Sequence, residues 1–182
     1  MAALAGLILL GLAVGKGHTP LDDWFSELDT QRPELGWLLV FTDGRVVVAL
    51  WAIVLAAALW QRRWPLAAAT AASPLVAVML ARLGKQVFGR TRFGELAYPS
   101  GHTALAVVVF AMAVLVVGVT TWSVVVAVVA TVLAVIGQSV TYHYFTDTIG
   151  ALFLGTAVVC VAVRAAKLDR CQPAGDRDHN CR

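Results

Sequence analysis

The sequence predicts an all-α fold, an integral membrane bundle of about six transmembrane helices. Of its 182 residues, 59% are hydrophobic and only 14% are charged, whereas a soluble domain has about 25% charged residues. The charged residues are also clustered, so long stretches contain none. Because a helix of about 20 apolar residues spans the hydrocarbon core of a bilayer, these stretches are candidate spans. The length suits a single membrane domain, residues 1–182, without a second sizeable domain.

Six apolar segments are the candidate transmembrane helices. They comprise residues 2–14, 44–60, 65–83, 102–119, 122–142 and 147–164. The first is short and is expected to be a shortened or tilted span, because the core of a signal peptide would follow a basic residue. Pro74 lies inside the third segment, where a membrane helix tolerates proline.

Polar segments separate these spans. Residues 16–43 are polar and acidic, which suits a loop with an interfacial helix. Thr19-Pro20, followed by Asp22 and Asp23, indicates the start of that helix, because acidic residues favour a first turn. Residues 84–101 are predicted to form a polar loop, and residues 165–182 a charged cytoplasmic tail.

The composition excludes several classes of partner. The net charge is only +3, and no basic stripe carries interleaved aromatic residues, so nucleic acid is not an expected partner. Cys160, Cys171 and Cys181 have no metal-ligand spacing and imply no disulfide framework. Cys160 is expected to be a small core residue. No metal or cofactor is predicted, and the sequence leaves the oligomeric state open.

Lysine and arginine in short loops predict the orientation in the membrane. Two basic clusters fall on one side of a six-span bundle: Arg62 with Arg63, and Arg164 with Lys167 and Arg170. That side is expected to be the cytoplasmic side of a bacterial plasma membrane, so residues 84–101 and 142–147 face outward. Lys85, Arg90 and Arg92 on the outer side depart from the rule. Binding of an anion is one reason for cations there.

The first candidate site residues lie in the stretch KQVFGRTR. Lys85 and Arg92 are separated by six residues, and Arg82 and Arg90 lie nearby. Guanidinium groups match phosphate oxygens in bidentate geometry, so this stretch is a candidate phosphate clamp. The alternative is a set of cations that extend toward lipid headgroups.

The stretch YPSGHTA opens the fourth apolar segment. Ser100 is a candidate helix N-cap, and Gly101 lets a ligand approach the backbone closely. Free N–H groups and the helix dipole favour an anion at such a helix start. An ordinary N-cap is the alternative, but it does not explain His102, whose ring is costly beside lipid unless it has a partner.

The stretch YHYFTD places His143 and Asp147 four residues apart. If this corner is helical, both side chains lie on one face. The Asp147 carboxylate then accepts the Nδ1 proton of His143 and leaves Nε2 as a free nucleophile. A His–Asp pair with only a structural role is the alternative. The predicted topology brings all three stretches to one side of the membrane, which favours a shared site.

In these three stretches the sequence resembles the type 2 phosphatidic acid phosphatase (PAP2) superfamily of membrane lipid phosphatases. The signature of that family is K-x6-R-P, then P-S-G-H, then S-R-x5-H-x3-D. This chain has Lys85-x6-Arg92, Pro99-Ser100-Gly101-His102 and His143-x3-Asp147 in the same order. The resemblance covers about residues 44–165, and six spans match the membrane core of the family.

The resemblance implies a role for each matching residue. The phosphate oxygens would be bound by Lys85, Arg92, Ser100 and the backbone of Gly101. His143 would attack phosphorus to form a phosphohistidine, Asp147 would orient His143, and His102 would protonate the leaving lipid oxygen. Water would then hydrolyse the intermediate, and the family requires no metal.

The chain departs from the family signature at two positions that bear on the site. Phe93 follows Arg92 in place of proline. Gly137 stands where the third signature has its arginine, so one phosphate ligand is missing. Arg90 is expected to fill that place if the short loop folds inward, and Arg82, one turn before Lys85, is the second choice.

The sequence therefore predicts an outward-facing, metal-independent phosphatase that acts on a phosphorylated lipid in the bilayer. Polyprenyl phosphates or diphosphates are the first expectation, followed by phosphatidic acid or phosphatidylglycerol phosphate. A non-catalytic lipid-phosphate binder or transport partner is a second class, because of Gly137. A vanadate-type peroxidase would share the phosphate pocket, but the pattern of spans argues against it.

Overall fold

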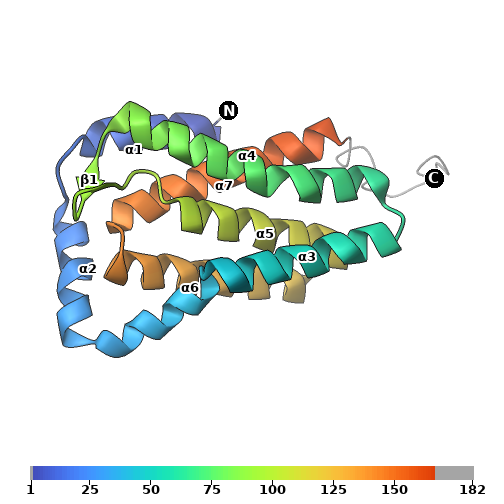
Figure 1. Cartoon of the computed structure of the whole chain (residues 1–182), viewed down its shortest axis with the longest axis horizontal. Helices are drawn as coiled ribbons and strands as arrows, with labels where there is room; N and C mark the ends of the chain where they lie inside the picture. The colour runs from blue at the N-terminus through green and yellow to red at the C-terminus, as the bar shows by residue number, and fades with distance from the viewer. Residues whose placement is uncertain (1, 167–182) are drawn as a thin grey trace.

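The protein, seen here as a computed structural model that describes residues 2–166, is an all-α membrane bundle (Figure 1). Its apolar helices are α1 (Ala2–Val14), α3 (Gly44–Trp60), α4 (Trp64–Phe88), α5 (Gly101–Val117), α6 (Thr121–Thr141) and α7 (Phe145–Ala165). Within the described residues, four segments are long and apolar enough to cross a membrane, and α1 and α5 are shorter apolar helices. The predicted fold class is thus confirmed.

The segments between the spans contain more regular structure than the sequence indicated. The acidic segment forms α2 (Pro20–Gln31) and the 3-10 helix η1 (Pro33–Phe41). The predicted polar loop is partly wrong, because α4 continues to Phe88 and a hairpin of β1 (Thr91–Arg92) and β2 (Glu95–Leu96) follows. The predicted tail lies almost wholly outside the described residues, as do Cys171 and Cys181.

Polar caps fix the starts of the helices. Thr19 and Asp22 form a capping box at α2, which confirms the predicted start of this helix. The Asp43 side chain accepts hydrogen bonds from the first turn of α3, and Thr120 caps α6. These side chains satisfy N–H groups that a helix start leaves unpaired.

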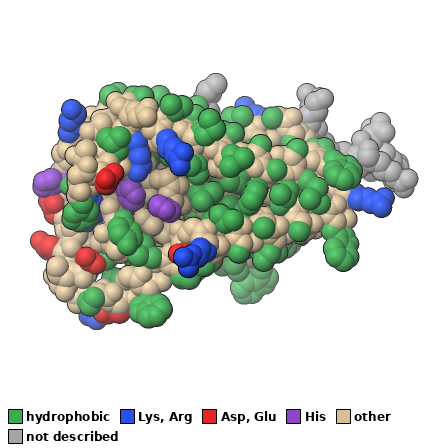
Figure 2. Space-filling model, viewed as in Figure 1, with side chains coloured by type: hydrophobic (Ala, Val, Ile, Leu, Met, Phe, Trp, Pro, Cys, Tyr) green, Lys and Arg blue, Asp and Glu red, His purple; other side chains and the backbone are tan. Residues whose placement is uncertain are grey.

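The lateral surface of the bundle is apolar. Each membrane helix exposes large apolar side chains, among them Leu9, Ile53, Leu75, Val117, Val126 and Val161. Charged and histidine side chains gather instead toward the end where α2 lies (Figure 2). A soluble protein rarely exposes such a continuous apolar surface, whereas hydrocarbon chains solvate it. Cys160 is exposed on α7, so its prediction as a core residue is wrong.

Helix α5 occupies the centre of the bundle, where it contacts α3, α4, α6 and α7. Its Ala104, Val108 and Met112 are fully buried. A helix surrounded by other helices needs apolar residues on all sides, which explains the uninterrupted apolar sequence after Thr103. The start of α5 is thereby held firmly between its neighbours.

Pro74 lies inside α4, as predicted, and the helix continues through it. Proline has no N–H, so the carbonyl four residues earlier loses its usual partner. That carbonyl belongs to Thr70, and it accepts a hydrogen bond from the Trp51 indole on α3 at 2.8 Å. A side chain from a neighbouring helix thus satisfies the freed carbonyl, which is how membrane helices tolerate proline.

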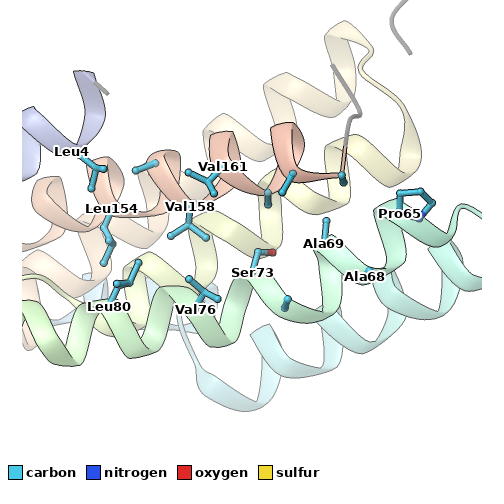
Figure 3. Close-up of a pocket in the computed structure, with 15 residues that line it drawn as sticks. Leu4, Pro65, Ala68, Ala69, Ser73, Val76, Leu80, Leu154, Val158 and Val161 are labelled. Atoms are coloured by element: carbon cyan, nitrogen blue, oxygen red, sulfur yellow. The ribbon is translucent and has the colours of Figure 1, made fainter. Parts of the chain in front are cut away.

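A groove of about 640 Å³ runs between α4 and α7 (Figure 3). Small and branched apolar side chains line it, including Ala69, Val76 and Val158. Ser73 also lines the groove, and its buried hydroxyl has no hydrogen-bond partner among the described residues. The groove therefore presents an almost wholly apolar surface between these two helices.

One end of the bundle carries the polar structure. Helix α2 lies across this end, near β1 and the α6–α7 corner (Figure 1). At the opposite end, Arg63 in the α3–α4 turn donates hydrogen bonds to the carbonyls of Leu115 and Val116 near the end of α5. A cation there matches the partial negative charge of a helix C-terminus. The bundle therefore has two chemically distinct ends.

Candidate active site

A cavity of about 470 Å³ lies at the end of the bundle that α2 covers. Its lining comes from α4, the hairpin, the start of α5 and the α6–α7 corner: Lys85, Arg92, Phe93, Glu95, Leu96, Ala97, His102, Tyr142 and His143. All three stretches singled out in the sequence contribute to this lining. Figure 2 shows histidine side chains beside basic side chains on this part of the surface.

Lys85 and Arg92 supply the positive charge of the cavity. Lys85 lies on the last turn of α4, and its ammonium group donates to the carbonyl of Leu96 at 2.7 Å. Arg92, on β1, donates to the backbone carbonyl of His143 and to the Ser26 hydroxyl of α2 at 3.2 Å. Burial lowers the pKa of Arg92, yet arginine stays cationic in proteins. Both cations are thus held in place by the protein itself.

The start of α5 lies beside this cavity. Ser100 is fully buried and caps the helix, accepting from the backbone N–H and the hydroxyl of Thr103. A methyl group added at Gly101 would meet nothing closer than Ala81, at 3.9 Å, so close packing does not explain this glycine. His102 follows in the first turn, lines the cavity and is exposed. Ser100 is thus a helix N-cap, which is the alternative that the sequence left open for it.

His143 and Asp147 are neighbours, although the corner between α6 and α7 is a turn rather than a helix. His143 Nδ1 lies 3.7 Å from Asp147 Oδ2, slightly beyond hydrogen-bond distance. That Nδ1 is buried and has no partner among the described residues. The Asp147 Oδ2 atom accepts instead from the backbone N–H of Tyr144 at 3.0 Å. Such contacts are often loose without substrate and tighten when it binds.

Arg90 does not line this cavity, which corrects the expectation that it binds phosphate there. Its guanidinium is buried and contacts Asp22 at 3.0 Å and Asp147 at 2.6 Å. It also donates to the hydroxyl of Thr146 and the carbonyl of Gly17. These partners occupy all of its nitrogens, so Arg90 is a structural cation. Arg82, the second choice, is exposed on α4 and is not among the lining residues.

Asp22 is the residue that the sequence interpretation missed. It was assigned to a helix start, and its capping bond to Thr19 is present, but the same carboxylate also contacts Arg90 and Thr146. Burial alone would raise the pKa of Asp22, but hydrogen bonds from Thr146, Thr19 and Arg90 outweigh this, so its pKa is lowered. No periodicity or spacing in the sequence pairs residues 68 positions apart.

Gly137, where the signature of the resembling family has an arginine, is covered by another part of the chain. It lies on α6, where η1 packs against it. A methyl group added at Gly137 would lie 2.7 Å from the backbone carbon of Leu38, a distance that side chains essentially never reach. An arginine cannot enter from this position unless η1 moves, so the glycine is explained by close backbone packing.

Substitution of Gly137 by alanine is therefore expected to destabilise the protein by about 1–3 kcal/mol, the usual cost of overpacking. The measurement is the thermal unfolding midpoint in detergent. Gly36→Ala is the matched control, because Gly36 lies in η1 with nothing within 4 Å of the added methyl group. Equal midpoints for the two variants would contradict the packing explanation.

Neither the comparisons nor the side-chain clusters identify a known counterpart or a metal centre. No protein family, curated protein or solved structure matches the chain. Between residues 2 and 166, no group of three His, Cys, Asp or Glu side chains is placed to hold a metal ion. The chemistry of the site therefore has to be inferred from its own side chains, which include two cations, two histidines and one carboxylate, Glu95, around one cavity.

Proposed function

We propose that this protein is a membrane phosphatase of the PAP2 type, which hydrolyses a phosphate ester of a lipid through a phosphohistidine. The observation that carries the proposal is the convergence of Lys85, Arg92, His102 and His143 on one cavity. They come from α4, β1, α5 and the turn between α6 and α7. Two cations and two histidines match the needs of phosphoryl transfer, which are charge stabilisation, a nucleophile and a general acid.

In the first step, Lys85 and Arg92 bind the phosphate oxygens and neutralise charge that spreads over them in the transition state. Nε2 of His143 attacks phosphorus, and the bond between phosphorus and the lipid oxygen breaks. Protonated His102 donates its proton to that oxygen, so the lipid leaves as an alcohol. Asp147, close to Nδ1, stabilises the positive imidazole ring of the phosphohistidine.

In the second step, neutral His102 takes a proton from water, and the resulting hydroxide attacks phosphorus. The bond between phosphorus and His143 Nε2 breaks, and inorganic phosphate leaves. Both histidines then have their starting protonation states. The apolar residues on the cavity wall, Phe93, Leu96 and Tyr142, suit a substrate whose phosphate is attached to a hydrocarbon chain.

The test is phosphate release by purified protein in detergent. A panel of polyprenyl monophosphates, polyprenyl diphosphates, phosphatidic acid and phosphatidylglycerol phosphate separates the substrate classes. Release from at least one of them is expected, together with acid-labile phosphate bound to the protein during turnover. Absence of release from every member of the panel would contradict the proposal.

His102→Ala is expected to slow cleavage of the lipid substrate by about 10²–10⁴-fold, the usual contribution of a general acid. An activated aryl phosphate needs little protonation of its leaving group, so the loss on that substrate is expected to be much smaller. The measurement is kcat/KM for both substrates. Equal losses on the two would show that His102 is not the acid.

The cavity is proposed to face away from the cytoplasm. Arg62, Arg63 and Arg164 lie at the ends of spans opposite to it, where the positive-inside rule places the cytoplasm. Three of the cations at the cavity end have local explanations, because Arg90 and Arg92 are buried among protein partners and Lys85 lines the cavity. These three cations therefore do not argue for the reverse orientation, whereas Lys16 and Arg32 are exposed at the same end.

This orientation predicts the labelling of introduced cysteines. In a variant whose Cys160, Cys171 and Cys181 are serine, Thr91→Cys on the exposed hairpin is expected to react with an impermeant thiol reagent in intact cells. Gln61→Cys, exposed in the α3–α4 turn, is the matched control and is expected to react only after lysis. The opposite pattern would reverse the topology.

A second candidate function is binding of a lipid phosphate without hydrolysis. The small number of cations favours this function, because Lys85 and Arg92 are the only cations among the described lining residues. The position of the third family cation is closed by η1 at Gly137. Saturable binding of a lipid phosphate with no release of inorganic phosphate would support this function over catalysis.

A further inference from the structure

We propose that Asp22 on α2 is a positioning residue for reaction at His143, acting through Arg90 and Asp147. The inference rests on the proposed function and adds to it a residue outside residues 44–165, the stretch that resembles lipid phosphatases. Asp22 does not line the cavity. Its influence on the reaction therefore has to pass through the side chains between it and His143.

A continuous series of polar contacts joins Asp22 to His143. Asp22 Oδ2 accepts from Arg90 Nη2 at 3.0 Å, and Arg90 Nη1 donates to Asp147 Oδ1 at 2.6 Å. The other oxygen of Asp147 lies 3.7 Å from His143 Nδ1. The series runs from α2 through the residues after α4 to α7. It links three segments that are remote in the sequence.

These contacts fix the rotation of the Asp147 carboxylate. Arg90 holds Oδ1, and the backbone N–H of Tyr144 holds Oδ2. The carboxylate therefore presents its Oδ2 edge to His143, whose Nδ1 is buried and otherwise without a partner in the described chain. If Arg90 moved, the plane of the carboxylate would no longer be fixed, and Asp22 is what holds Arg90 from the far side.

Asp22 also sets the charge behind His143. The cluster contains two carboxylates, Asp22 and Asp147, and one guanidinium, Arg90, all with side chains at most 1% exposed. Two negative charges and one positive charge leave one net negative charge beside the imidazole. Without Asp22, Arg90 would neutralise Asp147 completely. Because phosphohistidine formation makes the ring positive, the excess negative charge stabilises that step.

Helix α2 supports the second arginine as well. Its Ser26 hydroxyl accepts from Arg92 at 3.2 Å. The Arg90 and Arg92 guanidiniums lie 4.3 Å and 4.8 Å from the centre of the Tyr144 ring. Both arginines are therefore held between α2 and the α6–α7 corner. This arrangement makes α2 a support behind the site rather than a simple connection between spans.

The titratable and charged groups around His143 come from every element packed against it: Lys85, Arg92, Glu95, His102, Tyr142, Tyr144 and Asp147, with Arg90 and Asp22 behind Asp147. Asp22→Asn removes one negative charge from this group of residues and nearly preserves the size of the side chain. Asp23→Asn is the matched control, because it removes the same charge from the same helical turn, where the side chain is 53% exposed and pairs with His18.

Asp22→Asn is expected to lower kcat by about 10–100-fold, by analogy with the loss of partners that orient metal-binding side chains, with KM changed little. The acid limb of the kcat/KM profile is expected to move to lower pH, because less negative charge favours the neutral imidazole. Asp23→Asn is expected to match the wild type in all three quantities. Wild-type kcat and an unmoved acid limb in Asp22→Asn would overturn the inference.

Asp22→Glu keeps the negative charge but displaces the carboxylate. It tests the positioning role of Asp22 if Asp22→Asn does not fold. It is expected to lower kcat while the acid limb stays in place, and wild-type kcat would overturn the role.

The ¹⁵N NMR signal of the His143 imidazole, assigned with His143→Gln, provides a readout independent of turnover. Its titration is expected at lower pH in Asp22→Asn; coincidence with wild type would overturn the inference. Inactivity of the wild type would overturn only the proposed function.

Discussion

Replacement of His143 by alanine is expected to reduce phosphate release by about 10⁴-fold or more, because removal of a nucleophile costs at least this much in enzymes that use covalent catalysis. The fold is expected to survive. The contact between Arg92 and residue 143 uses the backbone carbonyl, which alanine keeps. His143 Nδ1 makes no hydrogen bond within the described residues, so no buried partner loses its bond.

Two measurements check this prediction. Acid-labile phosphate is expected on the wild-type protein during turnover and is expected to be absent from His143→Ala. The unfolding midpoint in detergent is expected to be close to that of the wild type. His18→Ala is the matched control, because His18 is exposed outside the cavity and pairs with Asp23. Turnover by His143→Ala at the wild-type rate would exclude the phosphohistidine.

The helices and most of the cavity were predictable, because both depend on local patterns. Apolar length predicted the spans, and Thr19 with the acids after it predicted the start of α2. Lys85, Arg92, His102 and His143 were recognised by residue type and spacing, and they line one cavity. The hairpin between α4 and α5 was not predicted, because strands of two residues leave no periodicity to read.

Long-range packing explains what the sequence could not predict. Gly137 was interpreted as a missing charge, but its physical reason is the backbone of Leu38, which approaches from η1. Arg90 was assigned to phosphate because it lies two residues from Arg92 in the sequence. Arg90 precedes β1 and its side chain is buried among protein partners, whereas Arg92 lies on β1 and lines the cavity. Arg90 pairs with Asp22 and Asp147, and no local pattern in the sequence connects these three residues.

This arrangement predicts that substitution of Arg90 affects the stability of the protein. Arg90→Met is expected to destabilise the protein by about 3–5 kcal/mol, because breaking a buried ion pair leaves an uncompensated charge. Here it leaves two carboxylates, Asp22 and Asp147, both fully buried. For a chain of this length, the unfolding midpoint is then expected to fall by roughly 10 °C. Arg82→Met, on the exposed surface of α4, is the matched control and is expected to unfold near the wild-type temperature.

A double substitution separates the structural role of Arg90 from a role in binding phosphate. If Arg90 serves to neutralise the two carboxylates, Asp22→Asn combined with Arg90→Met is expected to recover part of the lost stability, since the double variant has one buried charge fewer to compensate. Residues in contact show such non-additive effects, typically of about 0.5–3 kcal/mol. A phosphate ligand would behave differently: Arg90→Met would keep the wild-type unfolding midpoint and raise KM for the lipid substrate. That result would show that Arg90 leaves its carboxylate partners to bind phosphate, and it would restore the interpretation that its burial argues against.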